Sequence, residues 1–182
     1  MGWIPAILAV GLVGMFVLTY NALVRLRNQF RNAWHQIDVQ LKRRYDLIPN
    51  LVEVVKDYMA YEQETLTRVI EARGAAISAK GASAQGKAEN VLTESLKSLF
   101  AVVEKYPELK ANQNVAALQE ELTGTENKIS FARQFYNDSV MTYNNKIQSI
   151  PSNMIASLFD FSQAEYFEAG EESRTVPRAD LR

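Results

Sequence analysis

Residues 4–20 are an uncharged run of mostly apolar side chains near the start of the 182-residue chain, and this run limits the possible folds more than any other feature. Extending it from Trp3 to Val24 adds only Asn21 as a plainly polar side chain. As a helix the run would be about 25–33 Å long, which is enough to cross a hydrocarbon core of roughly 30 Å. The sequence therefore predicts a transmembrane anchor at residues 1–24.

A cleaved signal peptide is the alternative interpretation of this run. No basic residue precedes it and no A-x-A cleavage site follows it, so an uncleaved anchor is favoured. Three basic residues, Arg25, Arg27 and Arg31, come directly after the run. The positive-inside rule then predicts a single-pass protein of the inner (cytoplasmic) membrane with its soluble part in the cytoplasm.

Composition excludes several classes of site. With 20 basic and 21 acidic residues the net charge is -1, which gives no general attraction for nucleic acid. The absence of cysteine excludes disulfides, thiolate metal sites and cysteine nucleophiles. The single histidine, His35, cannot build a multi-histidine metal site, and no glycine-rich phosphate loop or nucleophile elbow is present. We expect no enzymatic activity, catalytic residue, cofactor, metal or small-molecule substrate.

Apolar side chains recur every three or four residues from Leu23 to Ile70, which predicts one long helix that continues the membrane span without a hinge. Residues 74–90 hold three glycines among small and polar side chains, which predicts a turn between antiparallel helices with frayed ends. Two further periodic runs follow, at 91–103 and 115–150. We predict an all-α fold in which the N-terminal transmembrane helix continues into a long antiparallel bundle of three to four helices, at residues 25–150.

Three prolines interrupt these periodic runs. Pro49 predicts a kink or break that curves the first helix, while Pro107 and Pro151 predict helix ends. From Pro151 onward, residues 151–167 form a segment rich in aromatic side chains, which is expected to pack on the bundle, on a neighbour or on the membrane. Residues 168–182 form a polar tail. The residues of this aromatic segment with a possible assembly or membrane contact are Met154, Ile155, Leu158, Phe159, Phe161, Tyr166 and Phe167.

Arg44 stands out among three consecutive basic residues. On a helical wheel Lys42 and Arg43 point outward, as a solvated face or a contact to lipid headgroups or another subunit, whereas Arg44 lies about 20° from the middle of the apolar seam. A buried guanidinium needs an anionic partner. Glu126 on the last helix is the best candidate.

The last helix carries a polar row beside its apolar seam. This row could be a catalytic carboxylate with its neighbours, or a buried hydrogen-bond network that fixes helix register, and the second interpretation is favoured because a di-metal site in a bundle needs several glutamates and E-x-x-H pairs. The predicted structural polar network contains Arg44, Glu126, Arg133, Asn137, Asn144, Tyr136 and Tyr143.

Several longer motifs, in the same order along the chain, resemble the LemA family of bacterial membrane-anchored helical proteins. They are YNALVRLRN (20–28), AWHQIDVQLKRRYDLIPNLV (33–52), YPELKAN (106–112), LQEELTGTENKISFAR (118–133), YNDSVMTYN (136–144) and IPSNMIASLFDF (150–161). Two positions depart from the usual family pattern: Ile150 replaces phenylalanine and Asp160 replaces glycine.

The resemblance implies one anchor, a bundle of long helices and no established enzymatic activity or cofactor. It also implies a role near membranes, because relatives in magnetotactic bacteria take part in forming magnetosome membranes and other members are often encoded beside membrane proteases. Two functions remain open. The first is a scaffold that forms homo-oligomers and organises or remodels the bilayer, and the second is an adaptor that recruits or regulates a membrane protease or envelope-stress component.

Overall fold

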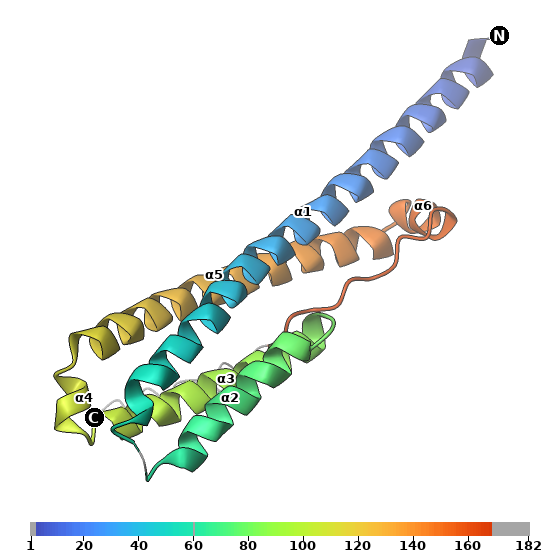
Figure 1. Cartoon of the computed structure of the whole chain (residues 1–182). Coiled ribbons are helices and arrows are strands. Elements are labelled where there is room, and N and C mark those ends of the chain that lie inside the picture. Colours follow the sequence, from blue (N-terminus) through green and yellow to red (C-terminus); the bar gives the residue numbers. More distant parts are fainter. Residues whose placement is uncertain (1–2, 60, 169–182) are drawn as a thin grey trace, which may run out of the picture. The chain divides into compact units, whose positions relative to one another are not determined.

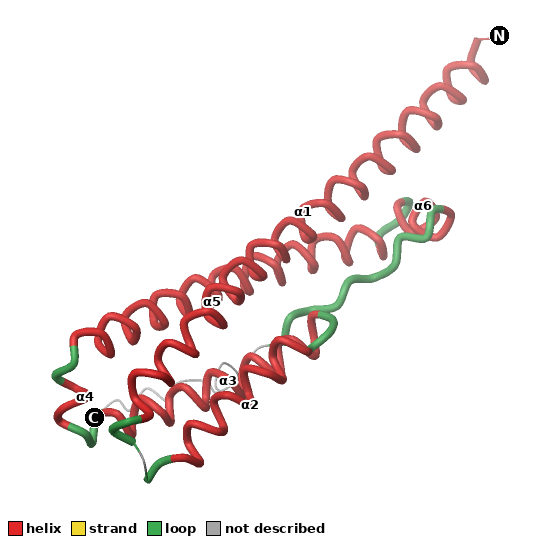
Figure 2. The backbone as a smooth tube through the Cα atoms, viewed as in Figure 1, coloured by secondary structure: helices red, strands yellow, loops and turns green. Residues whose placement is uncertain are grey.

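A computed structural model of the chain describes residues 3–59 and 61–168. Within these residues it contains six helices and no strand, which confirms the predicted all-α class with a long N-terminal apolar helix (Figures 1 and 2). The helices are α1 (Trp3–Lys56), α2 (Gln63–Ser78), α3 (Ala82–Val103), α4 (Pro107–Lys110), α5 (Gln113–Gln148) and α6 (Ser152–Leu158).

The described residues form two compact units. Unit 1 contains residues 3–37 and 132–166, and unit 2 contains residues 38–59, 61–131 and 167–168. Helices α1 and α5 contribute to both units: α1 passes from unit 1 to unit 2 after Ile37, and α5 passes from unit 2 to unit 1 after Phe131.

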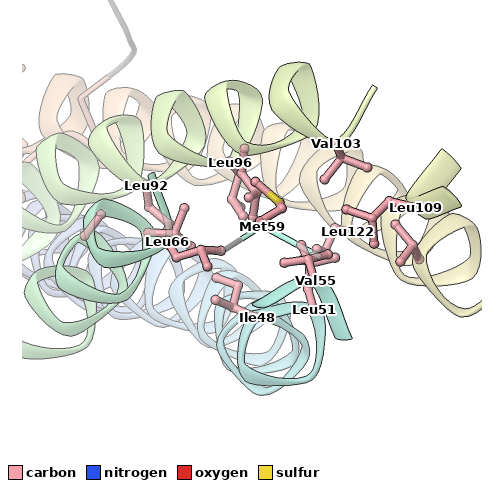
Figure 3. Close-up of a cluster of buried hydrophobic side chains, with 14 of the residues drawn as sticks. Ile48, Leu51, Val55, Met59, Leu66, Leu92, Leu96, Val103, Leu109 and Leu122 are labelled. Carbon is pink, nitrogen blue, oxygen red and sulfur yellow. The ribbon is translucent and has the colours of Figure 1, made fainter. Parts of the chain in front are cut away.

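Unit 2 has its core where α1, α2, α3 and α5 contribute one apolar row each (Figure 3). Leu51, Val55 and Leu99 are fully buried, and partly buried aromatic side chains pack around them. Burial of this apolar area is the main stabilising term of the unit. The labelled core residues are Ile48, Leu51, Val55, Met59, Leu66, Leu92, Leu96, Val103, Leu109 and Leu122.

The first helix is shorter than the sequence predicted. It ends at Lys56, and α2 begins at Gln63, whereas the periodicity suggested one helix through Ile70. The backbone N–H of Met59 bonds to the carbonyl of Val55 and closes the last turn, so the Met59 side chain reaches the core although its residue has left the helix. A buried apolar residue at helical spacing does not require that the helix continue to it.

The turn after α2 is also shorter than predicted. Helix occupies most of residues 74–90, and only 79–81 lie between α2 and α3. Gly81 takes a positive φ of 87° there, which is accessible to glycine without steric cost. The small residues on either side let α2 and α3 approach closely, since the Gln85 amide donates a 3.0 Å hydrogen bond to the Ala76 carbonyl. Among these small residues Ala76 and Ala82 are buried, and the prediction of a frayed turn across 74–90 was wrong.

Pro49 lies inside α1 and does not break it. A proline has no N–H, so the carbonyl four residues earlier, that of Tyr45, loses its helical donor. Arg73 on α2 supplies a replacement, because its Nε donates to the Tyr45 oxygen at 2.8 Å. An unusual sequence feature on one helix is thus compensated by a side chain from another.

The other two prolines lie close to helix boundaries. The sequence predicts that the second periodic run ends at Pro107, but α3 already ends at Val103. Pro107 is the first residue of the short helix α4, where its missing N–H is tolerated. Pro151 lies between the end of α5 at Gln148 and the start of α6.

In unit 1 α1 is uninterrupted, and its stretch from Leu23 to Trp34 packs antiparallel to the C-terminal part of α5. Aromatic rings contribute to this contact, with centroids 4.9 Å apart for Phe30 and Tyr143 and 5.4 Å apart for Trp34 and Tyr136. After α6 the chain turns at Asp160, whose φ is 53°. This left-handed conformation explains why glycine is the expected residue there and why aspartate, which tolerates it, is an acceptable replacement.

Candidate functional site

The most deeply buried charged cluster lies in unit 2 around Arg44, whose side chain is 2 % exposed. Its Nη1 lies 2.7 Å from Oε2 of Glu126 and 3.2 Å from Oε2 of Glu89. Its Nη2 donates to the Thr93 hydroxyl at 2.9 Å. The guanidinium therefore joins α1, α3 and α5, and the sequence-predicted partner Glu126 is one of two carboxylates that contact it.

Glu89 is fully buried and has further partners in the same unit. The Tyr45 hydroxyl donates to Glu89 Oε1, and the Gln85 amide donates to the Tyr45 oxygen at 2.9 Å and to Glu89 Oε1 at 3.1 Å. Burial, with smaller effects from the hydrogen bond to Glu89 and from its negative charge, raises the pKa of Tyr45 well above its usual value. The phenol is therefore a hydrogen-bond donor throughout the physiological pH range.

This arrangement supports a structural role more directly than a chemical one. Each charged atom in it has a partner of opposite charge or a hydrogen-bond donor, as a buried network needs in order to fix a unique packing. A pocket of about 150 Å³ adjoins it, lined by Arg44, Thr93, Phe100, Leu122 and Glu126 among others. Glu126 is the carboxylate of the cluster that reaches solvent, with 34 % of its side chain exposed, whereas the side chain of Glu89 is fully buried.

A second polar group lies in unit 1, where α5 holds the backbone that follows α6. Asn144 makes two hydrogen bonds of 2.9 Å to Ala164, one to its carbonyl and one from its N–H. The Tyr143 hydroxyl donates to the Ser162 carbonyl at 3.1 Å, and the Tyr136 hydroxyl donates to the Glu165 carbonyl at 2.8 Å. Three side chains of one helix thus fix the extended segment 162–165, which we call the clamped segment.

Burial, with a smaller effect from the charge of Glu165, raises the pKa of Tyr136 from 10.0 to about 12. As the pH rises past about 10, the unfolded chain loses this proton first, so the hydroxyl's contribution to stability is complete below that pH and decreases up to about pH 12. Urea unfolding of the wild type should therefore show a steeper loss of stability between about pH 10 and pH 12 than unfolding of Tyr136→Phe. Equal slopes for the two proteins would contradict the assignment.

The structure divides the sequence-predicted polar residues into two groups. Arg44 and Glu126 meet in unit 2, whereas Tyr136, Tyr143 and Asn144 hold the clamped segment in unit 1. Two further members of the predicted network, Arg133 and Asn137, are half-buried on the unit 1 part of α5.

The aromatic C-terminal segment divides in a similar way. Ile155 and Phe161 are buried in unit 1, and Phe167 is buried in unit 2. In contrast, Met154 is 71 % exposed and Leu158 is 69 % exposed. Phe159 and Tyr166 are 42 % and 46 % exposed. Part of the segment is thus internal packing, and part remains available for a contact. The predicted polar tail lies outside the described residues apart from Glu168.

Phe167 and Glu168 lie against α3 at Gly86, and this contact needs glycine. A Cβ added at Gly86 would lie 2.7 Å from the backbone nitrogen of Glu168 and 3.1 Å from Cδ1 of Phe167. The Glu168 carboxylate also accepts a 3.0 Å hydrogen bond from the Ser83 hydroxyl and lies 3.5 Å from Nζ of Lys87.

Sequence reasoning did not identify Tyr45, Gln85, Glu89 or Thr93 as members of the Arg44 cluster. Gln85 and Glu89 lie inside residues 74–90, which the sequence predicts to be a turn, and Thr93 lies just beyond them. A predicted turn has no helical face, so these residues had no predicted position on α3. On a helix Gln85 and Glu89 are four residues apart and share a face with Leu92 and Leu96, which is the signal that could have found them. Among residues 3–59 and 61–168, no three or more His, Cys, Asp or Glu side chains group closely enough to hold a metal ion.

A family model described as the LemA family matches residues 33–180, most of the chain. The chain belongs to the LemA family.

Three relatives extend the comparison. The magnetosome protein MamQ 2 of Paramagnetospirillum magneticum is 24 % identical over an alignment of 204 positions, gaps included. The alignment covers 96 % of this LemA-family chain and 75 % of the relative. Protein LemA of Metamycoplasma hominis is 26 % identical, with 93 % and 80 % covered. The magnetosome protein MamQ of Magnetospirillum gryphiswaldense is 23 % identical, with 93 % and 73 % covered. Together with the apolar part of α1, which is long enough to cross a membrane, these similarities support a membrane-associated helical protein.

Proposed function

We propose that this protein is a single-pass helical scaffold of the bacterial inner membrane that self-assembles and organises or remodels the bilayer. The exposure of the N-terminal part of α1 is the observation that carries this proposal. Only 6 % of its most apolar 18-residue window is buried, and Val10 and Leu18 are 74 % and 70 % exposed. Apolar surface of this extent is unfavourable in water and favourable among lipid tails. The arginines that follow, from Arg25 to Arg31, support a cytoplasmic location for the rest of the chain.

The anchor is continuous with the folded part of unit 1, which supports a mechanical role. Helix α1 has no break between Trp3 and Ile37, so its apolar stretch and the portion packed on α5 are one rigid segment. Contacts between copies of unit 1 would therefore fix the spacing of their anchors. The spacing and tilt of many anchors in turn determine how the lipids around them are arranged.

An open groove on unit 1 provides a surface for such a contact. Its volume is about 390 Å³, and Phe135 on α5, which is 45 % exposed, forms its apolar part. The other lining residues lie along one face of α1 and are mostly uncharged amides. An amide both donates and accepts hydrogen bonds, so a row of amides can pair with a copy of itself, whereas a row of like charges would repel its copy. The lining residues are Arg25, Asn28, Gln29, Asn32, Gln36 and Phe135.

Co-expression of two differently tagged full-length copies tests the proposal. Capture of one tag from mild-detergent extracts should recover the other copy in comparable amount, and imaging should show assemblies of uniform size. Asn32→Arg, which places like charges in the groove, should lower the recovery. Asn50→Arg is the matched control, because Asn50 is another exposed asparagine of α1 that lies in unit 2.

Two results would oppose the proposal. Solitary copies at native abundance would exclude self-assembly. Recovery of a second membrane protein in stoichiometric amount, without the other copy, would favour the adaptor function instead.

A further inference from the structure

Helix α6 and the residues that flank it expose large apolar side chains although they belong to a folded unit. Ile150 is 84 % exposed, Met154 is 71 % exposed and Leu158 is 69 % exposed. Phe159, at the end of the helix, is 42 % exposed. Such a concentration of exposed apolar side chains on ten residues marks a contact with an apolar environment rather than ordinary surface.

The surface of α6 is divided into three sides. Ile155 and Ala156 point inward and are buried in unit 1. Met154 and Leu158 are four residues apart and share one exposed side, while Asn153 and Ser157 share the other exposed side. The exposed part of the helix therefore has an apolar side next to a polar side, as in helices that lie at the boundary between lipid and water.

Ring contacts fix the level of α6 along α1. The Phe159 ring lies 5.8 Å from the ring of Phe16 and 4.9 Å from that of Tyr20, and the Phe161 ring lies 5.8 Å from that of Tyr20. Phe16 is inside the apolar run of α1, and Tyr20 is its last residue. From Trp3 to Tyr20 is about 26 Å of helix, close to the thickness of a hydrocarbon core, with an aromatic residue at each end as at a membrane interface.

A cationic side chain of α1, that of Arg27, also contacts the residues that follow α6. The guanidinium carbon of Arg27 lies 4.7 Å from the centroid of the Phe161 ring, about two helical turns beyond Tyr20. Arg27 is thus at the level expected for the headgroups when Tyr20 is at the edge of the hydrocarbon. At Phe159 the exposed apolar residues of the α6 region meet the apolar run of α1, because the Phe159 ring lies against Phe16 and Tyr20. Both Phe16 and Phe159 remain partly exposed, so the environment that surrounds the apolar run of α1 also reaches Phe159.

We propose that α6 is a second membrane contact that lies in the headgroup region and inserts Ile150, Met154, Leu158 and Phe159 into the adjacent acyl-chain boundary. This inference rests on the proposed function only in that α1 must cross the bilayer. The occupant of the surface is the lipid itself, and no particular headgroup is required, because the inserted side chains are apolar. Two attachment points on one rigid unit restrict its rotation about the anchor as well as its distance from the bilayer.

Site-directed spin labelling of the full-length protein tests this contact directly, because the chain contains no cysteine. Single variants Met154→Cys and Leu158→Cys report the apolar side of α6, and Asn153→Cys and Ser157→Cys report its polar side. Leu12→Cys in the middle of the anchor completes the set. All five positions are exposed, so the labels should not disturb packing. The labelled proteins are reconstituted into vesicles of phosphatidylethanolamine and phosphatidylglycerol, and collision rates with molecular oxygen and a water-soluble nickel chelate are compared.

The ratio of oxygen to nickel collisions should be severalfold higher at positions 154 and 158 than at positions 153 and 157, and highest at position 12. If position 12 collides with oxygen but positions 154 and 158 collide mainly with nickel, α6 faces water and this inference is wrong while the anchor stands. If positions 154 and 158 are shielded from both reagents, a protein neighbour covers them and the inference is also wrong. If position 12 itself collides mainly with nickel, the anchor and with it the proposed function fail.

Discussion

Replacement of Arg44 by methionine is expected to lower the free energy of unfolding by about 3–5 kcal/mol, because it removes the one cation that faces two carboxylates in the interior of unit 2. Glu89 has no exposed surface through which water could compensate the loss. Methionine keeps most of the volume of the arginine stem, so the loss reports the charge rather than a cavity. Urea unfolding of the full-length protein in detergent, followed by circular dichroism, measures the difference.

The neighbouring arginine provides a matched control. Arg43 forms an ion pair with Glu121, but the two side chains are 50 % and 46 % exposed, so Arg43→Met should cost no more than about 1 kcal/mol. The double variant Arg44→Met with Glu89→Gln should recover part of the loss, since it removes the charge left unpaired. Equal effects of the two single arginine replacements would contradict the buried network.

Replacement of Gly86 by alanine is expected to release the C-terminal residues from α3. The new Cβ would lie 2.7 Å from the nitrogen and 2.9 Å from the oxygen of the Glu168 backbone, and neither atom is the end of a flexible side chain. Release would expose Phe167, which is now 2 % exposed, and break the hydrogen bond from Ser83. Because loss of a buried phenylalanine contact costs about 3–5 kcal/mol and alanine in a helix regains about 1 kcal/mol, the net loss should be about 2–4 kcal/mol.

Gly74 is the control for this substitution, since it is a helical glycine with nothing within 4 Å of an added Cβ. Gly74→Ala should therefore raise the stability by about 0.5–1 kcal/mol, through helix propensity alone. Thermal unfolding separates the two variants, and hydrogen exchange of residues 161–168 should increase in Gly86→Ala only. If both alanine variants were stabilised, the contact at Gly86 would have no energetic importance.

Periodicity was sufficient to predict the helical class, the apolar N-terminal helix and the extent of α5, because long helices with one buried face repeat their apolar side chains over many turns. Periodicity failed to predict two helix boundaries, the end of α1 and the start of α3. The helix end at Lys56 was missed because Met59 stays buried after the backbone has left the helix. The start of α3 was missed because the alanines and glycines that allow close packing also resemble a turn.

The candidate sites show the same limit. A helical wheel placed Arg44 in the apolar seam because that judgement needs only one helix. Identifying Glu89 as its second partner needs the register between α1 and α3, which depends on the helix ends that periodicity misplaced. The hydrogen bonds from Tyr136, Tyr143 and Asn144 go to backbone carbonyls of the clamped segment. Every residue type has a backbone carbonyl, so the sequence of the clamped segment does not reveal these partners.

The order in which the segments of the two units occur along the chain has a consequence for biosynthesis. The central stretch of unit 2, residues 38–131, is contiguous and can fold as it leaves the ribosome. Unit 1 joins the first part of α1 to residues 132–166, so this part of α1 is translated long before its partners on α5 exist. The face of α1 that packs on α5 therefore remains uncovered while more than half of the chain is made, and its apolar side chains are open to other contacts during that interval.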